Sequence, residues 1–485
     1  MNIVKSIIIL LLCILPTLLT AQIAMPSAGI WGGELIYKNQ TTEFYLEISP
    51  DNNGNMIAKT YMPVIPFPKR TIGVITEIGD YFESGPIRFT MNNETLMIVG
   101  TFPGSSRALH FELRPIDDFP IVEPLKSHSN ATPVWTFTTN SAIWAGATAD
   151  QNNIYIGSTN GNMYSLSQSD GSQNWKYETN GRIFSRPLIH DAAVYFLSDV
   201  GYLFKINSET GSLLWSFDTG GGSWERRLPT DEIPGWDTAT SGVAIYGNTV
   251  FVGSADGHFF AIHLDKGTEK WRFKTDGPIH SVPVIEENIV VFGSYDRNVY
   301  ALNVETGELI WKFNTGQMIV SSPVLANGLV IIGSRSADLY ALDVHTGTEV
   351  WSYFHWGSWI ESSGTIFEGH LYIGSSDDQL LKSFNPNNGD LLWSTNLGGS
   401  PWSTPAVSHN TVFSGTLGNA NYDIDHRGGF FAVDRLTGHI IWNYMWEKKS
   451  DTSIYGVVSS PVVANGMVFF GGLDGVVYGF NVDNN

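Results

Sequence analysis

The sequence predicts an all-β protein, an eight-bladed β-propeller of four-stranded blades preceded by a small antiparallel β-barrel or sandwich. Three observations predict this fold: tryptophan recurs at gaps of 40, 40, 56, 40, 40, 42 and 49 residues, apolar residues alternate between these tryptophans, and the last repeat stops one strand short. A period near 40 with four alternating runs is typical of a propeller blade. The recurring tryptophans are Trp135, Trp175, Trp215, Trp271, Trp311, Trp351, Trp393 and Trp442.

Residues 1–21 predict a secretory signal peptide. Lys5 precedes an apolar run from Ile7 to Leu15 that is too short to span a bilayer, and Ala21 is a small residue at the expected cleavage point. The only cysteine, Cys13, lies in this segment, so the mature chain is expected to form no disulfide and no thiolate. We expect an exported protein that is periplasmic, secreted or cell-surface associated.

Residues 22–116 lack the 40-residue repeat and predict the small barrel or sandwich. Short alternating runs such as Phe44-Tyr-Leu-Glu-Ile48 and Leu109-His-Phe-Glu-Leu113 recur, and Asp51-Asn-Asn-Gly54 separates two of them as a hairpin turn does. This module is either a ligand-binding or docking unit or a rigid accessory domain. Residues 117–132 contain Pro120 and Pro124 and predict a linker.

Residues 133–485 contain the repeats. One unit reads Ser321-Ser-Pro-Val-Leu-Ala, Leu329-Val-Ile-Ile-Gly-Ser, Leu339-Tyr-Ala-Leu-Asp and Glu349-Val-Trp-Ser-Tyr, which are four strands separated by turn residues. The glycine of each Thr-Gly turn suits positive φ, and the following tryptophan is expected to cover the neighbouring blade.

The two ends of the repeat region are expected to share one blade. The last run, Val477-Tyr-Gly-Phe-Asn481, lacks the tryptophan-bearing strand that should follow it, and this strand occurs at the front as Pro133-Val-Trp-Thr-Phe137. Pairing of these two strands closes the ring and leaves no open edge.

Charge restricts the class of partner. The chain carries a net charge of −20, which becomes −21 when Lys5 leaves with the signal peptide. Such an acidic protein repels phosphate backbones, so we expect no nucleic-acid partner. No later apolar run reaches the length of a membrane helix, and we expect no transmembrane segment in the mature chain.

Insertions predict which face of the propeller binds. From repeat tryptophan to the next inner strand there are usually 10 residues, but 26 after Trp215 and 17 after Trp442, and the stretch from Val412 to Val433 is also long. All three extensions fall on the face that carries the connections between blades. The seven tryptophans outside the repeats and the module also fall in these connections, which predicts an aromatic binding surface.

Aligning the repeats places one residue per blade at the mouth of the axial funnel. We call these eight residues the mouth ring: Trp144, Phe184, Thr240, His280, Val320, Glu361, Trp402 and Val458. The candidate residues for binding a ligand or partner combine part of this ring with the long connections. They are Trp144, Phe184, Trp224, Arg226, Arg227, Trp236, His280, Trp356, Trp359, Glu361, Trp402 and Trp446.

Several polar groups near the mouth allow two interpretations. His280 and Glu361 form an acid/base or metal pair, or are separate solvated residues. Asp423-Ile-Asp425-His426 holds a metal, or is a flexible acidic loop. Arg226-Arg227 clamps an anion, or pairs with Glu225 and Asp231. We assign no catalytic and no metal-binding residue.

The repeat Tyr-Ala-Leu-Asp-x-x-Thr-Gly-x-x-x-Trp, followed by Ser-x-Pro-Val and Val-x-x-Gly-Ser-x-Asp-Gly, closely resembles the pyrroloquinoline-quinone (PQQ) repeat family over residues 133–485. The module loosely resembles lipocalin-like modules through Trp31-Gly-Gly-Glu-Leu35. The repeat resemblance implies either a quinoprotein dehydrogenase, which holds PQQ and Ca²⁺ at the axis, or a cofactor-free scaffold like the propeller subunit of the outer-membrane barrel assembly machine. Dehydrogenases of this family typically carry adjacent disulfide-bonded cysteines, which the mature chain lacks.

Two functions follow as expectations. The first is a non-catalytic propeller that binds a protein segment, or a small-molecule or saccharide ligand, on its tryptophan-rich face and needs no cofactor. The second is a cysteine-free, PQQ-dependent oxidoreductase for alcohols or sugars, with Trp402 or Trp144 stacking on the quinone and His280, Glu361 or Asp237 around it. Aromatic density without converging titratable groups favours the first.

Overall fold

The computed structural model describes residues 28–37, 40–61, 70–78, 81–84, 87–92, 95–101, 108–117, 131–223, 226, 237, 241–356, 358–419, 426–447 and 454–483. Within these ranges the chain is all-β, with one short 3-10 turn, η1 (Gly221–Ser223), and no α-helix. A helix long and apolar enough to cross a membrane is likewise absent from the described part. The proposed signal peptide and most of the proposed linker lie outside the described residues.

The N-terminal module is one curled antiparallel sheet of nine strands in the order β4-β3-β2-β1-β9-β8-β7-β6-β5. Its edge strands β4 and β5 are consecutive in the chain, separated only by Ile75, so the curl brings both edges together as in a half-barrel. The strands are β1 (Gly29–Tyr37), β2 (Gln40–Pro50), β3 (Met56–Tyr61), β4 (Arg70–Val74), β5 (Thr76–Ile78), β6 (Tyr81–Ser84), β7 (Ile87–Asn92), β8 (Thr95–Thr101) and β9 (Ala108–Ile116).

Alternation along the strands builds the core of the module. In β2 the side chains of Phe44, Leu46 and Ile48 are buried while their neighbours are more exposed, because successive residues of a strand point to opposite faces. The inward side chains of β1, β7 and β8 join the same core. The predicted barrel or sandwich is therefore confirmed as a curled antiparallel sheet with one buried face.

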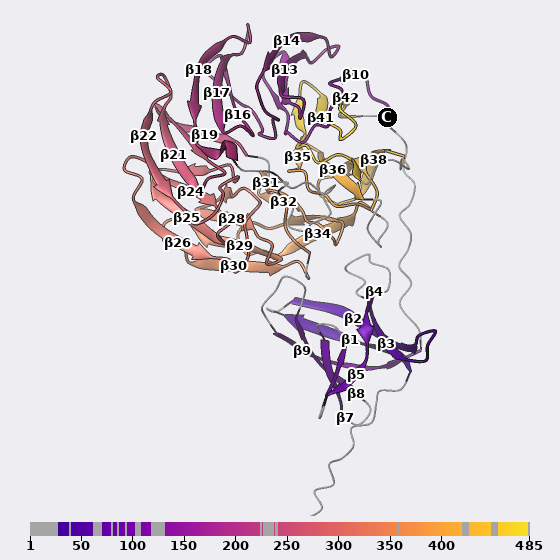
Figure 1. Cartoon of the computed structure of the whole chain (residues 1–485). Coiled ribbons are helices and arrows are strands. Elements are labelled where there is room, and N and C mark those ends of the chain that lie inside the picture. Colours follow the sequence, from indigo (N-terminus) through magenta and orange to yellow (C-terminus); the bar gives the residue numbers. More distant parts are fainter. Residues whose placement is uncertain are drawn as a thin grey trace, which may run out of the picture.

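Eight antiparallel sheets follow and form the propeller (Figure 1). The first four blades contain β11 (Thr148–Ala149), β12 (Asn153–Gly157), β13 (Asn162–Ser167), β14 (Gln173–Glu178); β15 (Leu188–His190), β16 (Ala193–Ser198), β17 (Tyr202–Asn207), β18 (Leu213–Asp218); β19 (Val243–Tyr246), β20 (Thr249–Gly253), β21 (His258–His263), β22 (Glu269–Lys274); and β23 (Val284–Glu286), β24 (Ile289–Gly293), β25 (Asn298–Asn303), β26 (Leu309–Asn314). In each blade the first strand lies innermost and the fourth outermost.

Blades 5 to 8 repeat this order. They contain β27 (Val324–Ala326), β28 (Leu329–Gly333), β29 (Asp338–Asp343), β30 (Glu349–Phe354); β31 (Thr365–Phe367), β32 (His370–Gly374), β33 (Leu380–Phe384), β34 (Leu391–Asn396); β35 (Ala406–Val407), β36 (Thr411–Asn419), β37 (Gly429–Asp434), β38 (Ile440–Met445), with β39 (Ile454–Gly456) paired to β36; and β40 (Val462–Ala464), β41 (Met467–Gly471), β42 (Val476–Asn481), with β10 (Trp135–Thr138).

The ring closes as the sequence predicts. Strand β10 pairs antiparallel with β42, with Trp135 opposite Gly479 and Thr138 opposite Val476, and so supplies the fourth strand of blade 8. Figure 1 shows β10, from the front of the repeat region, beside the C-terminal strands. Innermost strands β11 and β40 also lie in contact, so blade 1 meets blade 8.

The repeat tryptophans join each blade to the next. A Cβ on Gly307 would lie 2.6 Å from the Trp271 ring, and Gly347 stands in the same relation to Trp311. Both glycines have φ near +70°, so the turn needs glycine for its backbone and for the ring that covers it. The indole Nε1 of Trp271 donates to Val304 O at 3.1 Å and that of Trp311 to Val344 O at 2.8 Å. The predicted packing role of these tryptophans is confirmed.

One face of the propeller, which we call the loop face, carries both the connections between blades and the turns between second and third strands. The amide of Ile279 in one connection donates to Ser254 O in such a turn at 2.9 Å, and Ile183 does the same to Ser158 O at 3.2 Å. On this face β39 pairs with the end of β36, with Leu417 opposite Gly456. This pairing brings the predicted insertion after Trp442 against the one between Val412 and Val433.

The N-terminal module packs on the loop face at blades 5 and 6. Ala337, Phe354 and Trp356 of the propeller belong to the same buried cluster as the core of the module. The amide of Phe354 also donates to Gln40 Oε1 at 3.1 Å. The module therefore contacts the loop face at blade 5 and at the connection to blade 6.

Candidate functional site

Two rings of residues build the mouth of the propeller on the loop face. The mouth ring precedes each innermost strand. A second ring, the turn ring, follows the small residue that opens each turn between strands two and three. The turn ring consists of Thr159, Asp199, Ala255, Tyr295, Arg335, Ser376, Leu417 and Leu473. Because both loop types lie on one face, side chains of the two rings meet.

Blades 7, 8, 1 and 2 form the apolar half of the mouth. Trp144, Phe184, Trp402 and Val458 of the mouth ring pack with Leu417 of the turn ring in one buried cluster. The rings of Trp144 and Phe184 lie 5.9 Å apart. Trp402 donates its indole proton to Ser376 Oγ at 3.0 Å, so its polar atom is also satisfied inside the protein.

The ionic half begins at Asp237, a buried carboxylate in the long connection between blades 2 and 3. Its Oδ1 accepts from Arg226 NH1 at 3.1 Å and from the hydroxyl of Tyr295 at 2.7 Å, and its Oδ2 lies 3.1 Å from His280 Nε2. Arg226 also donates through Nε to Asp199 Oδ1 at 2.9 Å. Asp237 thus holds three side chains from two connections and one turn.

The charges around Asp237 stabilise one another. Burial opposes its ionised form, but His280 and Arg226 outweigh burial and lower the pKa of Asp237 below its ordinary value. Burial likewise opposes the charge of Arg226, while Asp237 and Asp199 raise the pKa of the guanidinium. Burial and the neighbouring Asp237 raise the pKa of Tyr295 well above its ordinary value, so the phenol stays a donor.

Blades 5 and 6 complete the ionic half with a bidentate pair. Arg335 donates through Nε to Glu361 Oε1 at 2.7 Å and through NH2 to Oε2 at 3.3 Å, and both side chains are buried. Its guanidinium lies 4.9 Å from the centre of the Trp359 ring. Burial opposes the charge of Arg335, but Glu361 raises the pKa of its guanidinium. Two parallel hydrogen bonds give this pair a fixed geometry.

Blade 6 carries a further buried cluster behind this pair. Lys382 on β33 contacts Asp378 in a short charge-assisted contact and lies 3.1 Å from His355 Nδ1. Burial lowers the pKa of Lys382, although Asp378 opposes that shift. Burial, followed by Lys382, lowers the pKa of His355 well below its ordinary value, so His355 stays neutral.

The position of Lys382 is aromatic in every other blade. The strand registers align it with Tyr164, Phe204, Phe260, Tyr300, Tyr340, Phe431 and Tyr478. In blade 4 the hydroxyl of Tyr300 donates to Asp296 Oδ2 at 2.7 Å. The Lys382–Asp378 pair is thus the ionic counterpart of a tyrosine–aspartate hydrogen bond.

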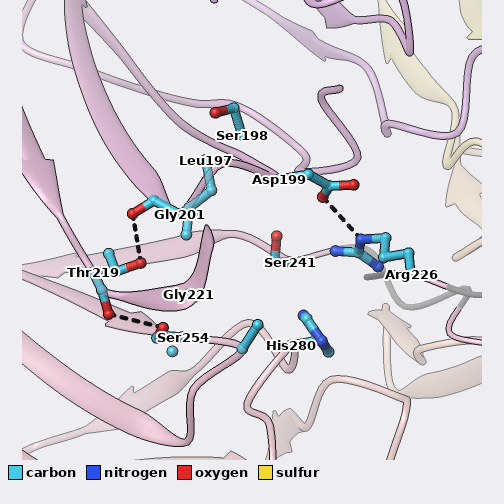
Figure 2. A pocket seen from close by; sticks show the side chains of 12 residues that line it. Leu197, Ser198, Asp199, Gly201, Thr219, Gly221, Arg226, Ser241, Ser254 and His280 are labelled. Atoms are coloured by element: carbon cyan, nitrogen blue, oxygen red, sulfur yellow. Dashed lines mark hydrogen bonds and ion pairs between the residues drawn. The ribbon is translucent and has the colours of Figure 1, made fainter. Parts of the chain in front are cut away.

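A small polar cavity of about 30 Å³ lies between blades 2 and 3, beside Arg226 and His280 (Figure 2). Figure 2 shows Arg226 extending to Asp199, with Ser241 and His280 nearby. Among the described residues, Ser198 Oγ has no hydrogen-bond partner although it is buried. The volume admits on the order of two water molecules.

The structure corrects the prediction of an exposed aromatic surface. Trp144, Trp402 and Phe184 are buried in the apolar half, and Trp356 is buried against the module. Only Trp359 and Trp446 among the described candidates remain half-exposed. Bulky apolar side chains that converge on an axis exclude water by contacting one another, so most of them became core.

The polar candidates are also placed differently from the expected pairings. His280 lies against Asp237 and Glu361 against Arg335, so they do not form one acid/base pair. Arg226 pairs with two aspartates, which satisfies the charge that a clamp would offer. Of the acidic loop, His426 is buried, whereas Asp423 and Asp425 lie outside the described residues, as do Trp224, Arg227, Trp236 and Thr240. Within the described ranges, no three His, Cys, Asp or Glu side chains group in a way that suits a metal ion.

Sequence reasoning missed the turn ring. Asp199, Tyr295 and Arg335 occupy one repeat position, directly after the serine of the turn, as in Ser198-Asp, Ser294-Tyr and Ser334-Arg. Aligning this position across blades, in addition to the one before the inner strand, would have found the partners of Arg226, Asp237 and Glu361. The Lys382 substitution at an aromatic repeat position was equally visible.

Comparisons with known proteins place this geometry in a family. The family model described as outer membrane protein assembly factor BamB matches residues 125–230, 217–355 and 299–485. Among solved structures, BamB from Moraxella catarrhalis is 18% identical with a TM-score of 0.54, covering 72% of this chain and 99% of that chain. A computationally designed protein, Ika8, is also 18% identical, with a TM-score of 0.57 and the same coverage.

Enzymes share the fold as well. The quinohemoprotein alcohol dehydrogenase from Comamonas testosteroni is 13% identical with a TM-score of 0.56, covering 73% of this chain and 77% of that chain. The search of curated proteins found no match. At these identities the likeness concerns the fold alone. Because the family model matches most of the chain, the protein belongs to the PQQ-like propeller family described as outer membrane protein assembly factor BamB.

Proposed function

We propose that this protein is a non-catalytic propeller that binds a protein partner on its loop face. The observation that carries the proposal is the internal pairing at the mouth. Arg226 is neutralised by Asp199 and Asp237, and Arg335 by Glu361. Acid/base catalysis needs a titratable group within reach of a substrate, and these groups are buried against one another.

The loop face still offers aromatic anchors for a partner. Trp359 is half-exposed and held by Arg335, and Trp446 is half-exposed with its indole donating to Asp474 Oδ2 at 2.9 Å. Side chains held in place lose little entropy on binding, which suits interface anchors. The described contacts of the module with this face lie at blade 5 and its connection to blade 6, away from Trp446. The proposed partner is a protein segment, and a saccharide is the second ligand class to test.

Site-specific photo-crosslinking tests this proposal. A crosslinking phenylalanine derivative replaces Trp359 or Trp446 on the loop face, or Tyr246 on the opposite face as control. Tyr246 is aromatic, 46% exposed and at the end of an innermost strand. We expect one defined adduct from the loop-face positions and none from Tyr246. Equal labelling from both faces, or labelling from Tyr246 alone, would contradict the proposal.

A PQQ-dependent dehydrogenase is the second candidate, favoured by the solved dehydrogenases that share the fold. The side chains present do not fit the quinone well. A ring stacked on Trp144 or Trp402 would displace the side chains of Phe184, Leu417 and Val458 that pack with them. We therefore derive no step through a quinone. Saturable tryptophan quenching by PQQ with Ca²⁺, together with dye reduction by alcohols or sugars, would establish this candidate instead.

We also propose export, with residues 1–21 as a cleaved signal peptide. The proposal rests on the charged start, the short apolar run and the small residue before Gln22. Mass spectrometry of the purified protein tests it. A mature N-terminus at Gln22 is expected, and an intact chain in an exporting host would contradict it.

A further inference from the structure

A third ring of residues lies one step further along the chain, at the start of the innermost strands. Each member directly follows the small residue after the mouth ring. We call it the axial ring: Gly146, Arg186, Gly242, Val282, Ser322, Ser363, Thr404 and Ser460. The structure describes all eight, and Arg186 is the one charged member.

Hydrogen bonds join members of this ring in neighbouring blades. The amide of Val282 donates to Ser322 Oγ of the next blade at 2.8 Å, and the amide of Ser322 donates to Ser363 Oγ at 2.8 Å. Further round, the amide of Thr404 donates to Ser460 Oγ at 3.1 Å. A hydroxyl that accepts an amide proton keeps its own O–H, so the ring presents hydroxyl donors.

Water reaches this ring although it lies inside the propeller. The innermost strands β15, β23, β31 and β40 are half-exposed at every residue. The second strands β16 and β24, further from the axis, are wholly buried. This order requires an axial channel open to solvent. The seven described residues of the mouth ring are buried and close the loop face where the structure describes it, so the channel opens on the opposite face.

Arg186 extends along this channel. A Cβ on Gly146 would lie 3.1 Å from Arg186 Cγ, 3.2 Å from its Cδ and 3.2 Å from Ser460 Cβ. The arginine side chain therefore crosses the inner edge of blade 1 towards Ser460 of blade 8. Gly146 has no positive φ, so the glycine provides space for the arginine and is not needed for the backbone.

The guanidinium of Arg186 has no counter-ion in the described part of the chain. No hydrogen bond or ion pair joins the guanidinium to a described residue. Burial lowers the pKa of Arg186, and no neighbouring carboxylate among the described residues opposes this shift. Arg226 and Arg335 differ, since neighbouring carboxylates raise the pKa of both. Arg186 is half-buried at the wall of the channel, where a cation without a counter-ion is unfavourable, so a bound anion would stabilise this arrangement.

We propose that Arg186 and the surrounding hydroxyls bind a small oxyanion in the axial channel. A guanidinium offers a planar fork of N–H donors that matches phosphate, sulfate or carboxylate, and Ser460 adds an O–H on the same side. The closed mouth limits the ligand to a small ion entering from the face opposite the loops. This site is independent of the proposed partner binding.

Thermal unfolding of the full mature chain tests the site. Wild type, Arg186→Gln and the exposed control Arg272→Gln are compared in a zwitterionic buffer with phosphate, sulfate, acetate or chloride at matched ionic strength. Phosphate and sulfate stabilise proteins generally by exclusion, and the variants separate that effect from binding. We expect a saturable rise of the midpoint in wild type and Arg272→Gln that Arg186→Gln lacks. The acetate arm shows whether carboxylates share the site.

Without oxyanions, the expected difference in stability between Arg186→Gln and wild type is reversed. Without oxyanions, Arg186→Gln should be at least as stable as wild type, because the unpaired cation is gone. An identical phosphate response in wild type and Arg186→Gln would overturn the proposal. If Arg186→Gln does not fold, calorimetric titration of wild type with inorganic phosphate decides: one saturable site per chain supports the proposal, and no saturable heat overturns it.

Discussion

The apolar and ionic halves of the mouth occupy the same repeat positions but are stabilised differently. In the apolar half, Trp144, Phe184 and Trp402 are held mainly by contact area, although Trp402 also donates to Ser376 Oγ. In the ionic half, Asp237 and Glu361 each depend on named partners at hydrogen-bond distance. The comparison teaches that the same repeat positions at the mouth accept either apolar packing or ion pairs, provided that each charge at the mouth has its partner.

Removing the aromatic rings should have the largest effect. A buried aromatic residue replaced by alanine costs about 3–5 kcal/mol, and two in one cluster do not add fully, so Trp144→Ala with Trp402→Ala should cost about 5 kcal/mol. Urea unfolding followed by far-ultraviolet circular dichroism measures this loss. Tyr246→Ala, at an exposed position, is the control. A double variant as stable as wild type would show that these rings are surface residues.

Removing the Asp237 carboxylate should cause the second-largest loss of stability. Asp237→Ala leaves Arg226, His280 and Tyr295 without their shared acceptor, and breaking a buried ion pair costs about 3–5 kcal/mol. We expect about 3 kcal/mol, at the lower end of that range, because Arg226 keeps Asp199. The same urea experiment applies, with the exposed Asp276→Ala as control. Losses matching the control would mean that the ionic half contributes nothing to stability.

Replacing the Lys382–Asp378 ion pair of blade 6 by a tyrosine–aspartate hydrogen bond should change the free energy of unfolding less. Lys382→Tyr restores the residue type of the other blades and lets the hydroxyl donate to Asp378, as Tyr300 does to Asp296. Since replacing buried ion pairs is often neutral, we expect a change within about 1 kcal/mol. Lys382→Leu, which lacks a donor, should lose about 3 kcal/mol. If both variants lose the same amount, the hydroxyl does not replace the ammonium.

The smallest expected effect is a difference in acid stability between variants of the ionic half and variants of the apolar half of the mouth. The folded pKa of Asp237 lies below its unfolded value of about 3.9, so its stabilisation is present above about pH 4 and is lost as pH falls towards the folded pKa. Asp237→Asn should therefore show a shallower decline of the unfolding midpoint than wild type between about pH 4 and pH 2.5. Trp144→Ala should keep the wild-type slope. Parallel curves for wild type and Asp237→Asn would contradict this assignment.

Much of the fold could be predicted because it depends on local repeats. The spacing of Trp271, Trp311 and Trp351, with a glycine turn four residues before each, is enough to define blades, and the incomplete last repeat predicts the pairing of β10 with β42. The candidate site was harder to predict from the sequence than the fold. Mouth-ring positions followed from alignment, but their burial did not, because exposure depends on what eight blades bring together at one axis.

By itself, the sequence determined the all-β class, the eight blades, the closure of the ring and the face that carries the insertions. These follow from period and turn chemistry, which act over a few residues. Only the tertiary structure decided that Trp144 and Trp402 are core, that Asp237 joins Arg226 to Tyr295, that Trp356 lies under the module and that Arg186 extends towards Ser460. Each is a contact between blades or domains, and such contacts depend on distances across the ring that no local pattern encodes.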